Sequence, residues 1–129
     1  MPLYRCTCPP DALDDEQRRA IAVAITDVHC TLTGAPPTFV HVQFLEQPAG
    51  AGRTPFVLHG GIRAGRDGTL VGSIVDRCTA AVARIAGVDE TDVSMRTSET
   101  NASWVFEGGR VFPEPGQEAA WLAEAPAGH

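Results

Sequence analysis

The sequence lacks any apolar run near the roughly 18 residues that a membrane-spanning helix requires. Residues 1–10 contain Arg5, Pro9 and Pro10, and they include no apolar core of the kind that a signal peptide carries. We therefore expect a cytoplasmic chain that has no membrane partner.

Cationic side chains are also scarce. Ten Lys and Arg residues stand against sixteen Asp and Glu residues, which gives a formal net charge of −6. Proteins that bind nucleic acids need a cationic face for the phosphates, so the balance argues against a nucleic-acid partner. A local cluster of arginines would still suit a small anionic ligand.

The spacings that mark metal and phosphate sites are missing as well. No C-x-x-C pair occurs, and Gly60, Gly61 and Gly65 lack the lysine and the spacing of a phosphate-binding loop. The cysteines and histidines are scattered, at Cys6, Cys8, Cys30, Cys78, His29, His41, His59 and His129. We expect reduced structural thiols, no metal and no cofactor.

The chain of 129 residues is long enough to bury a core without disulfides or metal, and we expect one domain over residues 1–129. Residues 2–8 are typical of a strand, and an acidic start with apolar residues at i, i+3 and i+4 predicts a helix over residues 13–33. Gly34 ends this helix, and alternating residues predict a strand over 38–45.

The same order then recurs after a turn at residues 47–54. It predicts a strand over 56–62, a helix over 69–86 capped by Asp67, and a strand over 92–97. A constant offset of 53 residues pairs Pro2 with Pro55, Asp14 with Asp67 and Gly34 with Gly87. We interpret residues 2–46 and 55–99 as pseudo-repeats.

Two such units predict an α+β fold of tandem β-α-β repeats, in which one four-stranded sheet carries both helices on one face. Residues 103–113 predict a short hairpin that turns at Gly108 and Gly109, and residues 115–123 predict a final helix anchored by Trp121. Nothing in the sequence is large enough to cover the other sheet face. We therefore expect a homo-oligomer with cyclic symmetry.

Pro2 is the first candidate for chemistry. A proline nitrogen inside a chain is an amide, but removal of Met1, expected before so small a second residue, would expose a secondary amine. An ordinary α-amino group has a pKa of about 7.7–8.0, and burial or nearby cations lower it. A neutral Pro2 would then act as a base, whereas a protonated Pro2 would act as an acid.

Arg63 and Arg66 lie three residues apart in a glycine-flanked loop at the end of a predicted strand. Their guanidinium groups could share one carboxylate and stabilise negative charge that develops beside it. This arrangement indicates a small 2-oxo acid or unsaturated acid as substrate. Taken alone, arginines in such loops are usually solvated.

The sequence resembles the tautomerase superfamily, and within it the cis-3-chloroacrylic acid dehalogenase family. The resemblance covers nearly the whole chain, and the segments that carry it follow in order: Met1-Pro2, AITDVH at 24–29, LTG at 32–34, FLEQP at 44–48, IRAGR at 62–66, EGGR at 107–110 and PEPG at 113–116. The resemblance implies a homotrimer.

The resemblance also implies roles for particular residues, namely Pro2, His29, Arg63, Arg66 and Glu107 as catalytic groups, with His29 and both arginines binding substrate. Arg96 stands where the dehalogenases have a tyrosine that works with the glutamate on water. This departure puts efficient dehalogenation in doubt, although a third cation would suit an anionic substrate.

Each of these residues also has a structural interpretation. His29 could be a core-edge histidine, Glu107 a turn carboxylate and Arg96 a surface strand residue. Three functions therefore stay open: a tautomerase of enol or 2-oxo acids such as phenylpyruvate, a hydrolytic dehalogenase or hydratase of 3-haloacrylate-like acids, and a non-catalytic binding protein on the same scaffold.

Overall fold

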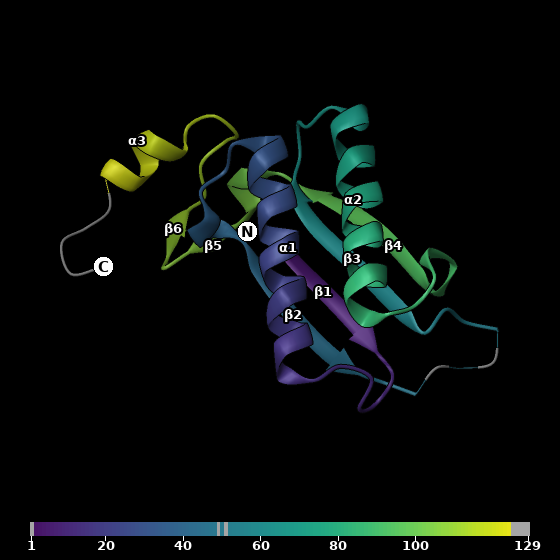
Figure 1. The fold of residues 1–129 in the computed structure, drawn as a ribbon. Coiled ribbons are helices and arrows are strands. Elements are labelled where there is room, and N and C mark those ends of the chain that lie inside the picture. Colours follow the sequence, from purple (N-terminus) through teal and green to yellow (C-terminus); the bar gives the residue numbers. More distant parts are fainter. Residues whose placement is uncertain (1, 49, 51, 125–129) are drawn as a thin grey trace.

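A four-stranded mixed sheet forms the centre of the molecule in the computed structural model, which describes residues 2–48, 50 and 52–124 (Figure 1). The strands are β1 (Leu3–Cys8), β2 (His41–Glu46), β3 (Phe56–Arg63) and β4 (Val93–Thr100), in the order β2-β1-β3-β4. β1 pairs parallel with β2, and β3 pairs parallel with β4, while the central pair β1 and β3 is antiparallel. The predicted tandem β-α-β fold is therefore confirmed.

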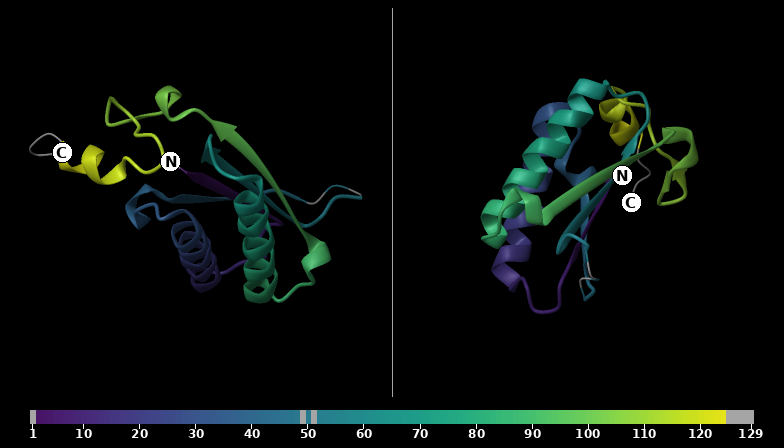
Figure 2. Two further views of the ribbon diagram at one scale, coloured as in Figure 1. Left: turned by 90° about the horizontal axis from the view of Figure 1, so that it is seen from above. Right: turned by 90° about the vertical axis from the view of Figure 1, so that its right-hand side faces the viewer.

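Both long helices, α1 (Asp15–Thr33) and α2 (Gly68–Ala86), lie on one face of the sheet, as expected (Figure 2). Asp14 caps α1 by accepting a hydrogen bond from the backbone N–H of Gln17, and Asp67 caps α2 in the same way through Thr69. The first helix begins two residues later than predicted, because Asp14 is its N-cap and lies just outside the helix.

The core lies between the helices and the sheet. Its side chains come from alternate positions of the strands and from one side of each helix, and include Tyr4, Cys6, Leu58, Ile62, Ile21, Ile25, Ile74, Cys78 and Val82. Burial raises the pKa of Cys6 and of Cys78 to about 12, so both thiols stay protonated at neutral pH. All four cysteines are free.

The opposite face of the sheet stays open within one chain. Leu3 is 39% exposed and Val57 is 36% exposed. The strand register places Arg5 beside His59, and His59 beside Arg96, on this same face. Because apolar groups are left in contact with water, this face fits the expected contact with another copy.

The C-terminal segment folds against the end of the sheet where β1 begins (Figures 1 and 2). It contains β5 (Phe106–Glu107), β6 (Arg110–Val111) and α3 (Glu118–Ala123). The hairpin turns at Gly108 and Gly109, which have φ angles of 60° and 81°. The final helix is shorter than predicted because Gly116, with a φ of 91°, still belongs to the preceding turn.

Phe39 explains a further difference from the predicted strand bounds. The strand predicted over residues 38–45 begins only at His41, because Pro37–Phe39 form a 3-10 turn. This turn directs Phe39 against Phe112 and Trp121, with ring centroids 4.6 and 5.8 Å away.

Across the described ranges, no helix is both long and apolar enough to cross a membrane.

Candidate active site

Pro2 lies at the end of the sheet where β1 begins and β3 ends. Its side chain is buried, and its carbonyl oxygen accepts a hydrogen bond of 3.0 Å from the backbone N–H of His41. The antiparallel register pairs Leu3 with Gly61, so one further step places Pro2 opposite Ile62. Pro2 therefore neighbours the strand end that carries Arg63.

His29 comes from the C-terminal half of α1 and is only 1% exposed. Its Nδ1 lies 2.8 Å from the hydroxyl oxygen of Tyr4, whose ring meets the imidazole edge to face. Tyr4 follows Pro2 by two residues, so the pleat of β1 directs both toward the helices. Tyr4 thereby fixes the imidazole at the end of the sheet that carries Pro2.

The environment keeps His29 uncharged. Burial, followed by the positive charges of Arg66 and Arg63, lowers the pKa of His29 to about 4. Burial also raises the pKa of Tyr4, so its hydroxyl keeps its proton and can donate to Nδ1. That arrangement leaves the imidazole hydrogen on Nε2, which is buried and has no hydrogen-bond partner among the described residues.

Arg66 lies in the loop that leads from β3 to α2, after Gly65, whose φ of 97° requires a residue without a Cβ. Its Nε is likewise buried without a hydrogen-bond partner in the described part of the chain. Burial, then the charge of Arg63, lowers the pKa of Arg66, but a guanidinium stays protonated in proteins. Arg66 is therefore a cation whose Nε–H can still donate a hydrogen bond to a ligand.

Arg63 is held quite differently. It is 1% exposed, and its two terminal nitrogens donate to the carbonyl oxygen of Pro113 at 2.6 Å and to the Glu118 carboxylate at 3.2 Å. Its guanidinium carbon also lies 5.1 Å from the centroid of the Phe112 ring. The C-terminal segment thus already supplies a carboxylate for Arg63, whereas no carboxylate of the described residues forms an ion pair with Arg66.

Glu107 is not joined to this cluster by any contact among the described residues. It lies half-buried in β5, opposite Arg110 of β6. Arg110 itself stacks on Trp121, 4.0 Å from the ring centroid, and donates to the Trp121 carbonyl at 2.8 Å. The hairpin lies at the same end of the molecule as the start of β1 (Figure 1).

Arg96 lies apart from the cluster within one chain. It is exposed in the middle of β4, opposite His59, on the open face of the sheet. Together with Arg53 and Ser94 it borders a hollow of about 670 Å³ near the start of β3. Arg63 lies at the other end of that strand, so one chain does not bring the two arginines together.

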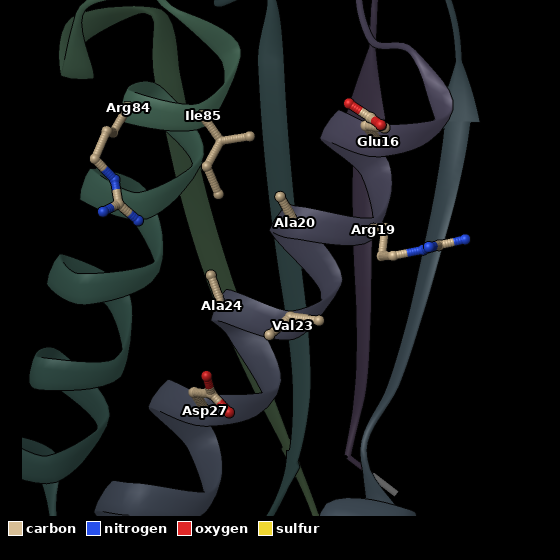
Figure 3. A pocket seen from close by; sticks show the side chains of 8 residues that line it. All are labelled: Glu16, Arg19, Ala20, Val23, Ala24, Asp27, Arg84 and Ile85. Atoms are coloured by element: carbon tan, nitrogen blue, oxygen red, sulfur yellow. The ribbon is translucent and has the colours of Figure 1, made fainter.

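A second hollow, of about 600 Å³, lies between the outer surfaces of α1 and α2 (Figure 3). Ile85 of α2 points across it toward Ala20 of α1, and Asp27 and Arg84 lie at its border (Figure 3). Its lining includes neither a histidine nor a cysteine, and Pro2 does not border it, so we assign the chemistry to the end of the sheet. The described residues include no group of three or more side chains suited to a metal ion.

Sequence reasoning missed two members of the cluster. Tyr4 is the single tyrosine of the chain and alternates with Pro2 along β1, which could have placed it beside the site. Glu118 carried no such signal, because its pairing with Arg63 depends on how the C-terminal segment folds back over 55 residues of sequence.

The sequence model of a family described as putative oxalocrotonate tautomerase enzymes matches residues 1–125. The chain belongs to this tautomerase family. Similar solved structures include N1, a member of the cis-3-chloroacrylic acid dehalogenase family, with 29% identity and a TM-score of 0.90 over 97% of this chain and 93% of that one.

Two other structures extend the comparison of this tautomerase family member. Native Ps01740 is 34% identical, with a TM-score of 0.76 over 82% of this chain and all of its own. A fused 4-OT, described as an asymmetric trimer, shares 16% identity and a TM-score of 0.77 over 93% of this chain and 98% of its own, which shows the shared fold alone. No curated protein matches the sequence.

Proposed function

We propose that this tautomerase family member moves a proton within small enol or 2-oxo acids, using the nitrogen of Pro2 after Met1 has been removed. One observation carries the proposal. At the end of the sheet that holds Pro2, the Nε2 of neutral His29 and the Nε of Arg66 are both buried, and neither has a hydrogen-bond partner within the described part of the chain. Buried donors that stay unpaired are rare, and a bound substrate would satisfy them.

In this mechanism, Arg66 binds the carboxylate of the substrate and places its reactive carbon beside Pro2. The neutral secondary amine takes a proton from the carbon next to the carbonyl, and the electron pair moves toward the carbonyl oxygen. The Nε2–H of His29 and the charge of Arg66 stabilise the negative oxygen that develops. Pro2 then returns its proton to that oxygen, which completes the conversion from keto acid to enol.

The alternative function is that of a hydrolytic dehalogenase or hydratase of 3-haloacrylate-like acids, which the similarity to N1 supports. In that reaction a protonated Pro2 would deliver a proton to carbon while Glu107 directs water. Two points favour the isomerase: the resemblance implies a tyrosine in the dehalogenases where this chain has Arg96, and Glu107 makes no contact with the cluster within the described chain. A non-catalytic binding protein would need neither a free Pro2 nor its chemistry.

We also propose that the chain assembles as a homotrimer. The open face of the sheet, with Leu3 and Val57 partly exposed, supports contact between copies. The trimeric fused 4-OT shares the fold, which makes three copies the favoured number.

The test compares Met1-free protein with Pro2→Ala, after mass spectrometry has verified the mature N-terminus. We expect the Met1-free enzyme to accelerate the loss of enol absorbance of phenylenolpyruvate, and Pro2→Ala to lose most of that activity. Halide release from cis-3-chloroacrylate without enol turnover would favour the hydrolytic dehalogenase instead. If neither reaction occurs, and if Pro2→Ala retains the effect of the protein in the cell, the results favour the non-catalytic binding protein.

A further inference from the structure

The pairing of Arg63 with Glu118 gives the site a feature that the sequence did not predict. Glu118 opens α3, and its carboxylate accepts hydrogen bonds from the Gly116 backbone N–H at 2.6 Å and from Arg63 at 3.2 Å. Burial alone would raise the pKa of Glu118, but hydrogen bonds from backbone N–H groups and from Arg63 outweigh it and lower that pKa. Glu118 is therefore a fixed negative charge beside a cation expected to bind substrate.

The rest of the C-terminal segment holds Glu118 in this position. The indole N–H of Trp121 donates to the Val111 carbonyl at 2.8 Å, and its ring packs edge-on against Phe112. On the far side, Arg63 donates to Pro113 at 2.6 Å and is almost wholly buried. These contacts bury the Arg63 guanidinium and use one N–H group of each of its two terminal nitrogens.

We propose that Glu118 is a specificity-determining residue: it neutralises Arg63, so that Arg66 alone binds the substrate carboxylate and the site selects monocarboxylates over dicarboxylates. This inference rests on the proposed function, because it assigns the substrate class of the same site. The contrast between the two arginines supports it: Nε of Arg66 has no hydrogen-bond partner among the described residues, while each terminal nitrogen of Arg63 already donates a hydrogen bond.

The proposed preference for monocarboxylates follows from the net charge of Arg63, Arg66 and Glu118. Two uncompensated arginines would present two positive charges and would favour a second carboxylate on the ligand. With Glu118 paired to Arg63, the two arginines and the glutamate leave a single net positive charge, which one carboxylate neutralises. A second carboxylate would then be buried without a partner and beside Glu118, which is unfavourable.

Glu118→Gln tests the proposal because it removes the charge from a side chain of nearly the same size, and its amide oxygen can still accept a hydrogen bond from Arg63. The hydrogen bond that the second carboxylate oxygen accepts from the Gly116 N–H is lost, so a variant that keeps the charge is needed beside it. The measurement is the ratio of Kd values for benzoate and isophthalate by calorimetry on Met1-free protein. We expect the variant to shift this ratio toward isophthalate by about tenfold, as one unpaired charge predicts. Glu118→Asp, which keeps the charge, should retain the preference of the wild type.

Glu114→Gln is the matched control, because Glu114 lies in the same segment and is exposed. It should leave the ratio unchanged. An unchanged ratio in Glu118→Gln would overturn the proposal, and so would an equal gain in affinity for both ligands, which would instead indicate a segment that must open to admit any ligand.

A second readout concerns Pro2. Loss of the Glu118 charge leaves more positive charge around the site, so the acid limb of kcat/KM with phenylenolpyruvate should move to lower pH in Glu118→Gln and stay in place in Glu114→Gln. An acid limb that does not move contradicts the charge-neutralising role. The calorimetric ratio needs no turnover, so an inactive wild type would reject the proposed function while the ratio still decides the role of Glu118.

Discussion

At the scale of single residues, His29 links the helix layer to the sheet and to the site. Its pKa of about 4 in the folded chain lies below the ordinary value near 6.5, because burial and two arginines oppose its charge. Between these two values the unfolded chain binds the extra proton, so stability rises with pH and is lost as the pH falls from 7 toward 4.

Replacement of His29 by Asn should therefore flatten the acid side of the stability profile. Between pH 7 and pH 5 the wild type should lose about 2 kcal/mol of unfolding free energy through this histidine, and the variant should not. Urea unfolding at fixed protein concentration across this range measures the difference. Parallel profiles for the two proteins would mean that His29 carries a proton in the folded state.

Residues that belong to a periodic pattern in the sequence could be placed on helices and strands before the structure was known. Contacts between residues far apart in the sequence could not. His29 and Arg66 both lie at the end of the sheet near Pro2, and the catalytic roles that the resemblance implies for them stay predictions. The expectation that Arg63 and Arg66 share one substrate carboxylate also stays a prediction, and the Glu118 pair argues for Arg66 alone. No local pattern could reveal that pair, because long-range folding creates it.

At the scale of elements, β3 passes so close to β1 that only glycine fits at one point. A Cβ on Gly60 would lie 2.8 Å from Cε1 of Tyr4 and 3.3 Å from the methyl carbon of Met95. Because the same tyrosine ring holds His29, the close approach of two strands determines the position of a catalytic candidate.

Gly60→Ala should therefore push the Tyr4 ring away and destabilise the fold by about 1–3 kcal/mol. Gly72→Ala is the control: it lies in α2, nothing crowds a Cβ there, and alanine should stabilise the helix by about 0.5–1 kcal/mol. Chemical denaturation of both variants gives the comparison. Equal stability in the two would show that β1 and β3 can separate without cost.

Helix ends were predicted more accurately than strand ends, for a physical reason. Asp67 and Gly87 act through hydrogen bonds and backbone angles that are local to the sequence. The start of β2, by contrast, is delayed by a turn that brings Phe39 to Phe112 and Trp121, which follow it by more than 70 positions in the printed sequence. Alternation along the chain cannot anticipate such a contact.

At the scale of the whole molecule, the two faces of the sheet differ. The helices bury one face, and the other leaves Val57 36% exposed between Thr7 of β1 and Ser94 of β4. The sequence predicted this imbalance from the count of helices alone. The number of copies depends on surface shape, which the pattern of a single chain does not specify.

Val57→Glu should dissociate the proposed trimer, because a carboxylate would be buried between copies without a partner. Val23→Glu is the matched control, since Val23 is 55% exposed on the outer side of α1. Sedimentation velocity should show three copies for the wild type and for Val23→Glu, and smaller species for Val57→Glu. A monomeric wild type, or an intact Val57→Glu trimer, would contradict the proposed interface.

The proposed mechanism requires that the nitrogen of Pro2 exchange a proton beside the cationic side chains of Arg63 and Arg66. A ¹⁵N NMR titration of Met1-free protein, labelled at proline and compared with Pro2→Ala for assignment, measures the pKa of this nitrogen directly. Base catalysis predicts a pKa well below the 7.7–8.0 of an ordinary α-amino group, because buried cations disfavour the charged form. A pKa near 9 or above, or no titrating signal at Pro2, would contradict base catalysis by this residue.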